Sequence, residues 1–202
     1  AWLEIDLPES RVRARSFDPV LGWSDVVELE RALSEPRQLL SAVELAASPD
    51  GSFLVTWKLD RPNVGVRGVR WTPESGFSEV SIFRPNLPTF SYSVGLDVAR
   101  GGAAILAVME PVPEIDGSQL VTRRAAPNST FGADEPLTDV DWNWDGSFRL
   151  ALDASGNGHA LVTEGNHTGG GWSVTLFHES VAGGWEMRHV ETGACCGTPR
   201  AD

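Results

Sequence analysis

Short runs of alternating apolar and polar residues recur along the chain at a fixed interval. An aromatic residue opens one such run every 54 residues, at Trp23, Phe77, Phe131 and Trp185. The same interval joins a column of aliphatic residues, Val12, Val66, Leu120 and Val174. Self-similarity at a fixed spacing is typical of proteins built from repeated structural units. The pattern therefore predicts four copies of one unit.

Three copies contain a small turn followed by an apolar run, at residues 48–57, 99–109 and 154–164. The turns hold an Asp-Gly pair, a Gly-Gly pair and a Gly-Asn-Gly triplet, which supply the positive φ angles of tight hairpins. We expect each segment to join the first two strands of its unit.

Two further strands complete each predicted unit. The third strand is expected within 10–19, 64–73, 118–127 and 172–181. The fourth is expected within 22–30, 76–83 and 184–191, with a weaker copy within 130–141. Four short antiparallel strands per ~50 residues predict an all-β fold, because helical repeats have an apolar period of 3.6 residues. A single helical turn is expected only at Ser34 to Leu40.

This four-strand repeat resembles the blades of β-propellers, nearest in length to the Kelch, sialidase-type and TolB-like bacterial groups. The segment SPDGSFLVTW at 48–57 is similar to a sialidase Asp-box, but Asp50 and Gly51 are adjacent and the box is broken. The resemblance implies one propeller segment of about four blades. The first blade, at residues 1–40, is partial. Three complete blades follow at 41–90, 91–145 and 146–192, and residues 193–202 form a connector.

The first copy is incomplete. Ala1 and Trp2 match Thr56 and Trp57, so the first blade is expected to lack its first strand and most of its second. An uncovered sheet edge invites pairing with other strands. We expect this unit either to belong to a larger propeller or to be completed by another chain.

The net charge and the residue composition limit which classes of partner and which cellular locations are expected. The net charge of -12 argues against nucleic acids and anionic membranes, which require basic patches. No apolar run approaches the ~20 residues of a transmembrane segment. Eight tryptophans, 21 glycines and 13 prolines in a chain that begins at alanine are typical of exported bacterial β-proteins, so an extracellular or periplasmic location is expected.

A calcium site is the sharpest local hypothesis. In the stretch 139–147, DVDWNWDGS, oxygen-bearing side chains alternate and end in Asp-Gly, as hard cations require. The stretch resembles the loops of integrin-type propellers, which implies side-chain ligands from Asp141, Asn143 and Asp145 and a carbonyl ligand from Ser147. The closing carboxylate is replaced by Arg149. The alternative is a solvated turn between blades.

Histidines and cysteines gather near the C-terminal end. With a four-residue loop at 181–184, His178 would face Met187 and Leu176 would face His189, making His178 and His189 diagonal neighbours able to share a transition metal. Solvated histidines are the alternative.

The adjacent Cys195 and Cys196 could form a strained vicinal disulfide, form bridges to other segments, or remain free thiols. In an exported protein we favour a disulfide to a segment or partner outside these residues.

Arginines recur on the third strands, at Arg13, Arg15, Arg67, Arg70, Arg123 and Arg124. A sialidase-like site would need three converging arginines and a tyrosine nucleophile, for which Tyr92 is the only tyrosine. We instead expect ion pairs with acidic residues of neighbouring strands, such as Glu28, Glu30 and Glu79. The repeated aromatic residues are expected to pack between adjacent sheets.

These patterns together favour a non-catalytic binding or scaffold module that contacts a protein partner or the rest of a longer chain. Trp142 and Trp144, which have no counterparts in the other copies, form the expected binding patch. Calcium is the one cofactor expected. We expect no enzymatic activity. The alternative function is carbohydrate binding or sialidase-like glycoside hydrolysis, with a glycan as partner.

Overall fold

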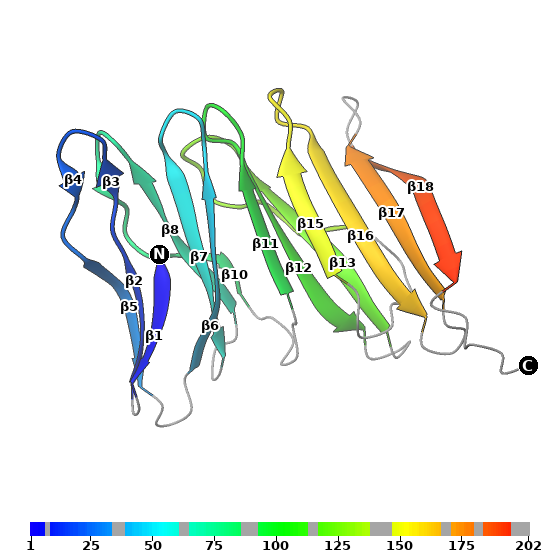
Figure 1. The fold of residues 1–202 in the computed structure, drawn as a ribbon, viewed down its shortest axis with the longest axis horizontal. Helices are drawn as coiled ribbons and strands as arrows, with labels where there is room; N and C mark the ends of the chain where they lie inside the picture. The colour runs from blue at the N-terminus through cyan, green and yellow to red at the C-terminus, as the bar shows by residue number, and fades with distance from the viewer. Residues whose placement is uncertain are drawn as a thin grey trace, which may run out of the picture.

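The computed structural model describes residues 1–6, 9–33, 39–60, 65–85, 93–112, 117–137, 147–166, 171–179 and 184–194. Within these ranges every regular element is a β-strand and no helix occurs, so the predicted all-β class is confirmed. The strands form antiparallel sheets that follow one another in chain order (Figure 1).

Four main sheets correspond to the four predicted units. The first has the order β1 (Trp2–Asp6), β2 (Glu9–Ala14) and β5 (Val27–Leu33), with a separate hairpin of β3 (Phe17–Asp18) and β4 (Gly22–Trp23). The second consists of β6 (Leu39–Ala47), β7 (Phe53–Asp60), β8 (Gly65–Thr72) and β10 (Ser81–Arg84), with β9 (Gly76–Phe77) beside β8. The third consists of β11 (Ser93–Val98), β12 (Ala104–Val112), β13 (Gly117–Ala125) and β14 (Glu135–Pro136). The fourth consists of β15 (Ser147–Leu152), β16 (Gly158–Asn166), β17 (Gly171–Glu179) and β18 (Trp185–Ala194).

The predicted hairpins are present. Their turns contain Gly51, Gly101, Gly102 and Gly156, all with φ between 85° and 89°. The weak fourth strand of the third copy is correspondingly short: β14 has two residues, and one of them is a proline, which cannot donate a hydrogen bond to a neighbouring strand.

Two local expectations were wrong. Leu39 and Leu40 belong to strand β6 rather than to a helical turn, while residues 34–38 lie outside the described part of the chain. The first sheet also keeps more of its second strand than expected. Trp2 matches Trp57, which lies in the middle of β7, so five residues of the corresponding strand remain as β1.

Each interface between successive sheets is filled by its own apolar cluster. Val12 of the first sheet packs with Val55 and Trp57 of the second. Val66 of the second packs with Leu106 and Val108 of the third. Leu120 of the third packs with Phe148 and Phe177 of the fourth. The aliphatic column seen in the sequence therefore marks the side of each sheet that faces the next one.

Arginines provide a second contact that repeats with the same spacing. Arg70 of β8 donates a hydrogen bond to the carbonyl oxygen of Gly102 in the next sheet at 2.9 Å. Arg124 of β13 does the same to Gly156 at 3.0 Å. Both pairs of positions differ by 54 residues, and burial lowers the pKa of both guanidinium groups. Each arginine therefore joins the third strand of one sheet to the first hairpin turn of the next.

The sheets do not close into a ring among the described residues, since no strand pairing joins the first sheet to the fourth. Figure 1 shows them as an open row. Four antiparallel sheets of blade-like composition are thus established, whereas a closed propeller is not.

Loss of either arginine contact is expected to destabilise the stack. Arg70→Ala or Arg124→Ala should lower the free energy of unfolding by about 1.5–3 kcal/mol, because each leaves a partly buried carbonyl without its charged donor. Chemical denaturation monitored by tryptophan fluorescence measures the change. Arg100→Ala, at an exposed position in a turn, is the control. Equal stability of all three variants would show that these contacts do not hold the sheets together.

Candidate binding surfaces

The recurrent arginines are engaged in structural contacts. Arg67 pairs with Glu30, whose carboxylate also accepts a hydrogen bond from the Trp57 indole. Arg84, only 5% exposed, lies 2.9 Å from Glu110 and 3.0 Å from Asp134. The expected pairing with neighbouring acids is thus confirmed for Glu30, and Glu28 joins the network described next. Glu79 takes part in no ion pair among the described residues.

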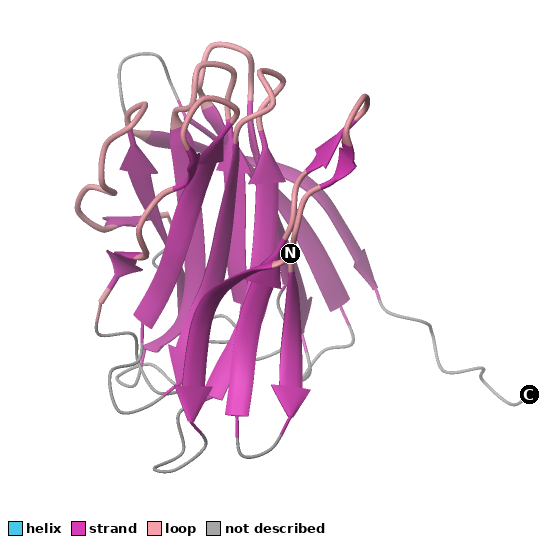
Figure 2. Cartoon of the chain, turned by 90° about the vertical axis from the view of Figure 1, so that its left-hand side faces the viewer, coloured by secondary structure: helices cyan, strands magenta, loops and turns pink. Residues whose placement is uncertain are grey.

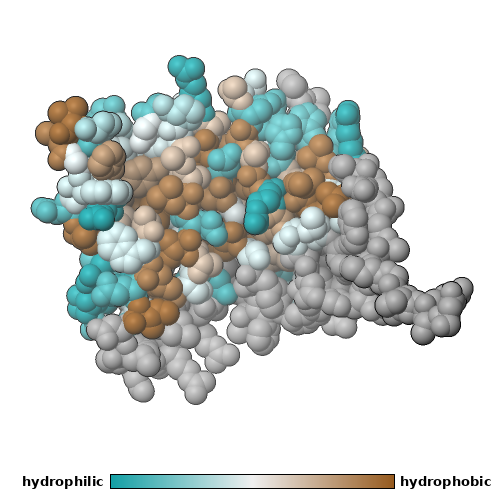
Figure 3. All heavy atoms as spheres, in the orientation of Figure 1, coloured by the Kyte–Doolittle hydropathy of each residue, from teal (hydrophilic) through white to brown (hydrophobic). Residues whose placement is uncertain are grey.

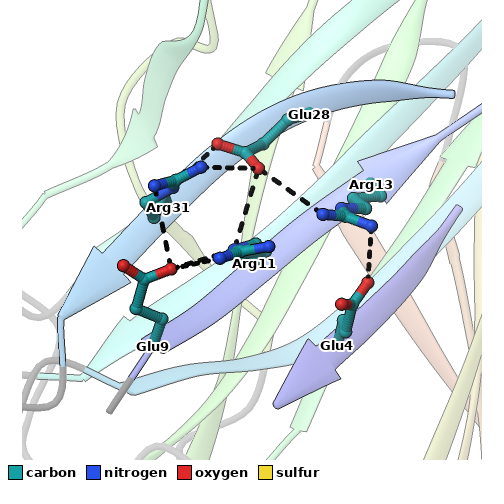
Figure 4. A network of polar contacts seen from close by, with 6 residues as sticks. All are labelled: Glu4, Glu9, Arg11, Arg13, Glu28 and Arg31. Carbon is teal, nitrogen blue, oxygen red and sulfur yellow. Dashed lines mark hydrogen bonds and ion pairs between the residues drawn. The ribbon is translucent and has the colours of Figure 1, made fainter. Parts of the chain in front are cut away.

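The outer face of the first sheet carries a network of six charged residues (Figure 4). Arg13 lies 2.8 Å from Glu4, and Arg31 lies 3.0 Å from Glu28. Arg11 pairs with Glu9 and also approaches Glu28 at 3.8 Å. The hydrogen bond from Arg11 lowers the pKa of Glu9, and the bond from Arg31 lowers the pKa of Glu28. This face is therefore polar and internally neutralised.

The β3–β4 hairpin of the first sheet exposes an unusual concentration of apolar side chains. Figure 2 shows the hairpin standing apart from the other turns at this end of the sheets, and Figure 3 shows apolar atoms gathered there. We call the exposed large residues of this hairpin and of the segment that leads into β5 the apolar hairpin patch: Phe17, Val20, Leu21, Trp23, Val26 and Val27. Val20 and Leu21 at the tip are 90% and 86% exposed.

The tip has a defined shape because its backbone is hydrogen bonded. The Asp18 carboxylate accepts hydrogen bonds from the backbone N–H groups of Val20 at 2.7 Å and Leu21 at 2.8 Å. The bond from Leu21 and then the bond from Val20 lower the pKa of Asp18. Gly22 then turns the chain with φ of 82°. The two apolar side chains are consequently held outward rather than left to collapse onto the sheet.

A second surface is a cleft between the second and third sheets, with a volume of about 320 Å³. Two aromatic residues line it, Phe83 and Phe131, whose rings lie 4.8 Å apart. The lining also includes hydroxyl and amide groups, among which the side chains of Ser81, Asn128 and Thr130 make no hydrogen bond within the described part of the chain. A lining of aromatic and polar groups suits a small hydroxylated ligand.

The outer face of the fourth sheet is partly apolar. Val174, the last member of the aliphatic column, is only partly buried, whereas Val12, Val66 and Leu120 are each 0% exposed. Leu161 on the same face is 41% exposed. No described sheet covers this side of the stack.

The predicted partner of His178 is wrong. Glu179, not Ser180, is paired with Trp185, so the loop is one residue longer than expected and the pairs from Thr175 to Glu179 shift by one. A bulge between Val174 and Thr175 restores the expected register farther from the loop. His178 lies opposite Glu186, and His189 lies opposite Thr175. Because a one-residue shift exchanges the two faces of a strand, the reason for grouping His178 with His189 is lost.

His178 instead contacts His159 across β16 and β17. The two Nδ1 atoms are 3.3 Å apart and the rings are stacked at 4.7 Å. No group of three or more metal-ligating side chains occurs among the described residues.

The other predicted sites fall mostly outside the described residues. Asp141, Asn143, Asp145, Trp142 and Trp144 lie there, as do Cys195 and Cys196. Ser147 is described and begins β15, where its carbonyl oxygen accepts a hydrogen bond from the Thr163 hydroxyl at 3.1 Å. Calcium binding, the tryptophan patch and the disulfide remain predictions.

The sequence did not predict the apolar hairpin patch, because Trp23 occupies a repeat position at which a buried residue is expected. Trp23 was expected to pack between sheets like Phe77, Phe131 and Trp185, but it is 59% exposed. The other three pack against apolar clusters. The adjacent Val20 and Leu21 offered a usable signal, since the same turn of the second unit has Glu74 and Ser75 instead.

Comparisons with known proteins do not assign the chain to a family. No model of a known protein family matches the chain, and no curated protein is significantly similar to it. Within the described residues, no helix has the length and apolar character to span a bilayer.

The charged network predicts a specific response to acid. Glu9 and Glu28 have lowered pKa values, so their contribution to stability is present above the ordinary glutamate pKa of about 4.3 and is lost as the pH falls through the lower folded values. The double variant Glu9→Gln and Glu28→Gln should be less stable than the parent at pH 7, and the difference should shrink as the pH falls below the ordinary glutamate pKa. Thermal melts across this range provide the measurement. Glu74→Gln, in an exposed turn, is the control. A difference that stays constant with pH would contradict the assigned role.

Proposed function

We propose that this chain is a non-catalytic binding or scaffold module of an exported assembly and that it binds a partner protein. The observation that carries the proposal is the apolar hairpin patch, where Val20 and Leu21 are 90% and 86% exposed. Contiguous exposed apolar surface of this kind is typical of interaction sites, because isolated soluble proteins keep such surface small. Burying one such side chain contributes about 1.5–3 kcal/mol.

The chemistry of the patch favours protein over other partners. It presents aliphatic and aromatic groups, with Arg15 stacked over Trp23 at 4.3 Å as its nearest cation. The net charge of -12 disfavours nucleic acids and anionic lipids. An apolar centre surrounded by polar groups is the usual composition of a protein–protein interface.

The rest of the molecule supports the proposal by holding the patch still. The hydrogen bonds to Asp18 set the shape of the tip, and the apolar clusters and arginine contacts hold the sheets behind it. Binding to a preorganised surface costs less conformational entropy. We further propose that the sheets are blades of a larger β-propeller, because their order and spacing match that architecture.

A second candidate function is carbohydrate binding in the cleft between the second and third sheets. The specific observation in its favour is that Ser81, Asn128 and Thr130, whose side chains make no hydrogen bond among the described residues, line the same cleft as Phe131. Such a site would bind a neutral sugar through hydroxyl contacts and ring stacking.

Charging the tip tests the main proposal. The double variant Val20→Asp and Leu21→Asp should fold as the parent does and lose more than ten-fold in affinity for proteins that the parent retains from the secreted fraction of its source. Affinity capture with quantitative mass spectrometry, followed by titration of the recovered protein, provides the measurement. Val80→Asp, at an exposed valine of the second sheet, is the matched control. Equal retention by parent and tip variant would overturn the proposal.

The second candidate is tested by removing its polar groups. The double variant Ser81→Ala and Asn128→Gly should weaken any glycan binding at least ten-fold. Glycine preserves the backbone, because Asn128 has φ of 56°. A glycan array identifies the ligand, and calorimetry gives the affinities. An array without a hit, or a hit unaffected by the variant, would exclude sugar binding in this cleft.

A further inference from the structure

Two histidines of the fourth sheet form a pair across neighbouring strands. His159 on β16 lies directly opposite His178 on β17, and residues directly opposite one another in antiparallel strands share one face of the sheet. Their Nδ1 atoms are 3.3 Å apart, and both residues are partly exposed. The pair therefore presents two imidazole nitrogens side by side where solvent reaches them.

The separation of these nitrogens matches that of two ligands of one metal ion. A tetrahedral zinc ion holds imidazole nitrogens at about 2.0–2.1 Å, which places two of them about 3.3–3.4 Å from each other. Imidazole also suits copper and nickel. The rings are stacked, so they must rotate to point both lone pairs at one ion. The pairing of β16 with β17 thus sets the spacing, and only the ring orientation changes on binding.

A carboxylate lies beside the other ring nitrogen of His159. The Oδ2 atom of Asp153 is 3.8 Å from His159 Nε2. Asp153 is held in place because its Oδ1 accepts hydrogen bonds from the backbone N–H groups of Ser155 at 2.8 Å and Asn157 at 2.9 Å. Histidines that bind a metal usually direct their second ring nitrogen at a carboxylate, which fixes the tautomer. Asp153 is positioned for this role.

The place of the pair in the sheet keeps it accessible whether or not a further sheet covers this face. His178 is the counterpart of Arg70 and Arg124, since successive intervals are 54. Both arginines are partly exposed, although each contacts the next sheet. Glu186 of β18, which lies directly opposite His178, is exposed and adds a negative charge on the same side. A small cation can therefore approach from the rim of the sheet.

We infer that His159 and His178 bind a divalent transition-metal ion of the zinc type through their two Nδ1 atoms. Each neutral ring then carries its single proton on Nε2, and in His159 this N–H is directed toward the Asp153 carboxylate. Water or a group from another molecule occupies the remaining positions on the ion. The bound ion joins β16 to β17. This site is separate from the apolar hairpin patch and does not rest on the proposed function.

Calorimetric titration of the intact chain with zinc chloride tests the site. We expect saturable binding that His159→Gln and His178→Gln each weaken at least ten-fold. His189→Gln is the matched control, because His189 lies opposite Thr175, on the other face of the sheet from His178. Calcium should not compete with zinc, since calcium takes oxygen ligands. Thermal melts in the presence of a chelator check that each variant folds as the parent does.

Nitrogen-15 NMR of the histidine rings identifies the ligand atoms in the unaltered protein. Zinc should shift the Nδ1 resonances of His159 and His178 and place the ring proton of each on Nε2. Asp153→Asn, which keeps the Oδ1 acceptor of the turn, should weaken zinc binding roughly ten-fold.

Three results would overturn the inference: no saturable zinc binding, binding that neither His159→Gln nor His178→Gln weakens, or zinc-induced shifts confined to other histidines. A loss with His189→Gln as large as that with His178→Gln would also count against it. The apolar hairpin patch belongs to the first sheet and takes no part in these measurements, so their outcome is independent of the proposed function.

Discussion

The contact between one sheet and the next is the constraint on which the rest of this structure depends. Each sheet is thin and has two faces, so it can be stable only if a neighbour covers its apolar side. A fully buried aliphatic residue and an arginine that reaches a glycine carbonyl serve this purpose at successive interfaces. The glycine is essential to the second contact, because the turn that exposes its carbonyl needs positive φ. One spacing in the sequence thus sets both the apolar and the polar part of the interface.

Much of this arrangement could be predicted from the sequence, because a repeated unit repeats its contacts. The column through Val12, Val66 and Leu120 was visible as a 54-residue period and proved to be the buried side of each sheet. The weakness of β14 was also visible, since Pro136 lies in a segment with few alternating residues. Periodicity is informative here because each sheet meets its successor in the same geometry.

The candidate site was harder to predict, for two physical reasons. First, a loop longer by one residue changes which residues face one another beside it, so His178 lies opposite Glu186 rather than Met187. The contact of His178 with His159 comes from the pairing of β16 with β17, which the length of that loop does not set. Second, a repeat position has the same environment only where the whole unit is present. Trp23 occupies the same column as Trp185, but it lies in a separate hairpin paired with Phe17 and is 59% exposed. Sequence identity at a repeat position therefore did not ensure equal burial.

The ion pairs on the first sheet have a consequence for how copies of the chain meet. A head-to-tail contact would bring the partly apolar outer face around Val174 against the charged face around Arg11 and Glu28. Closing such a contact would strip water from several charges that are already paired with one another, and the apolar face would gain little in return. Heterologous contacts that do not close on themselves generate filaments. The charged face of the first sheet is thus a poor complement for the partly apolar face of the fourth sheet.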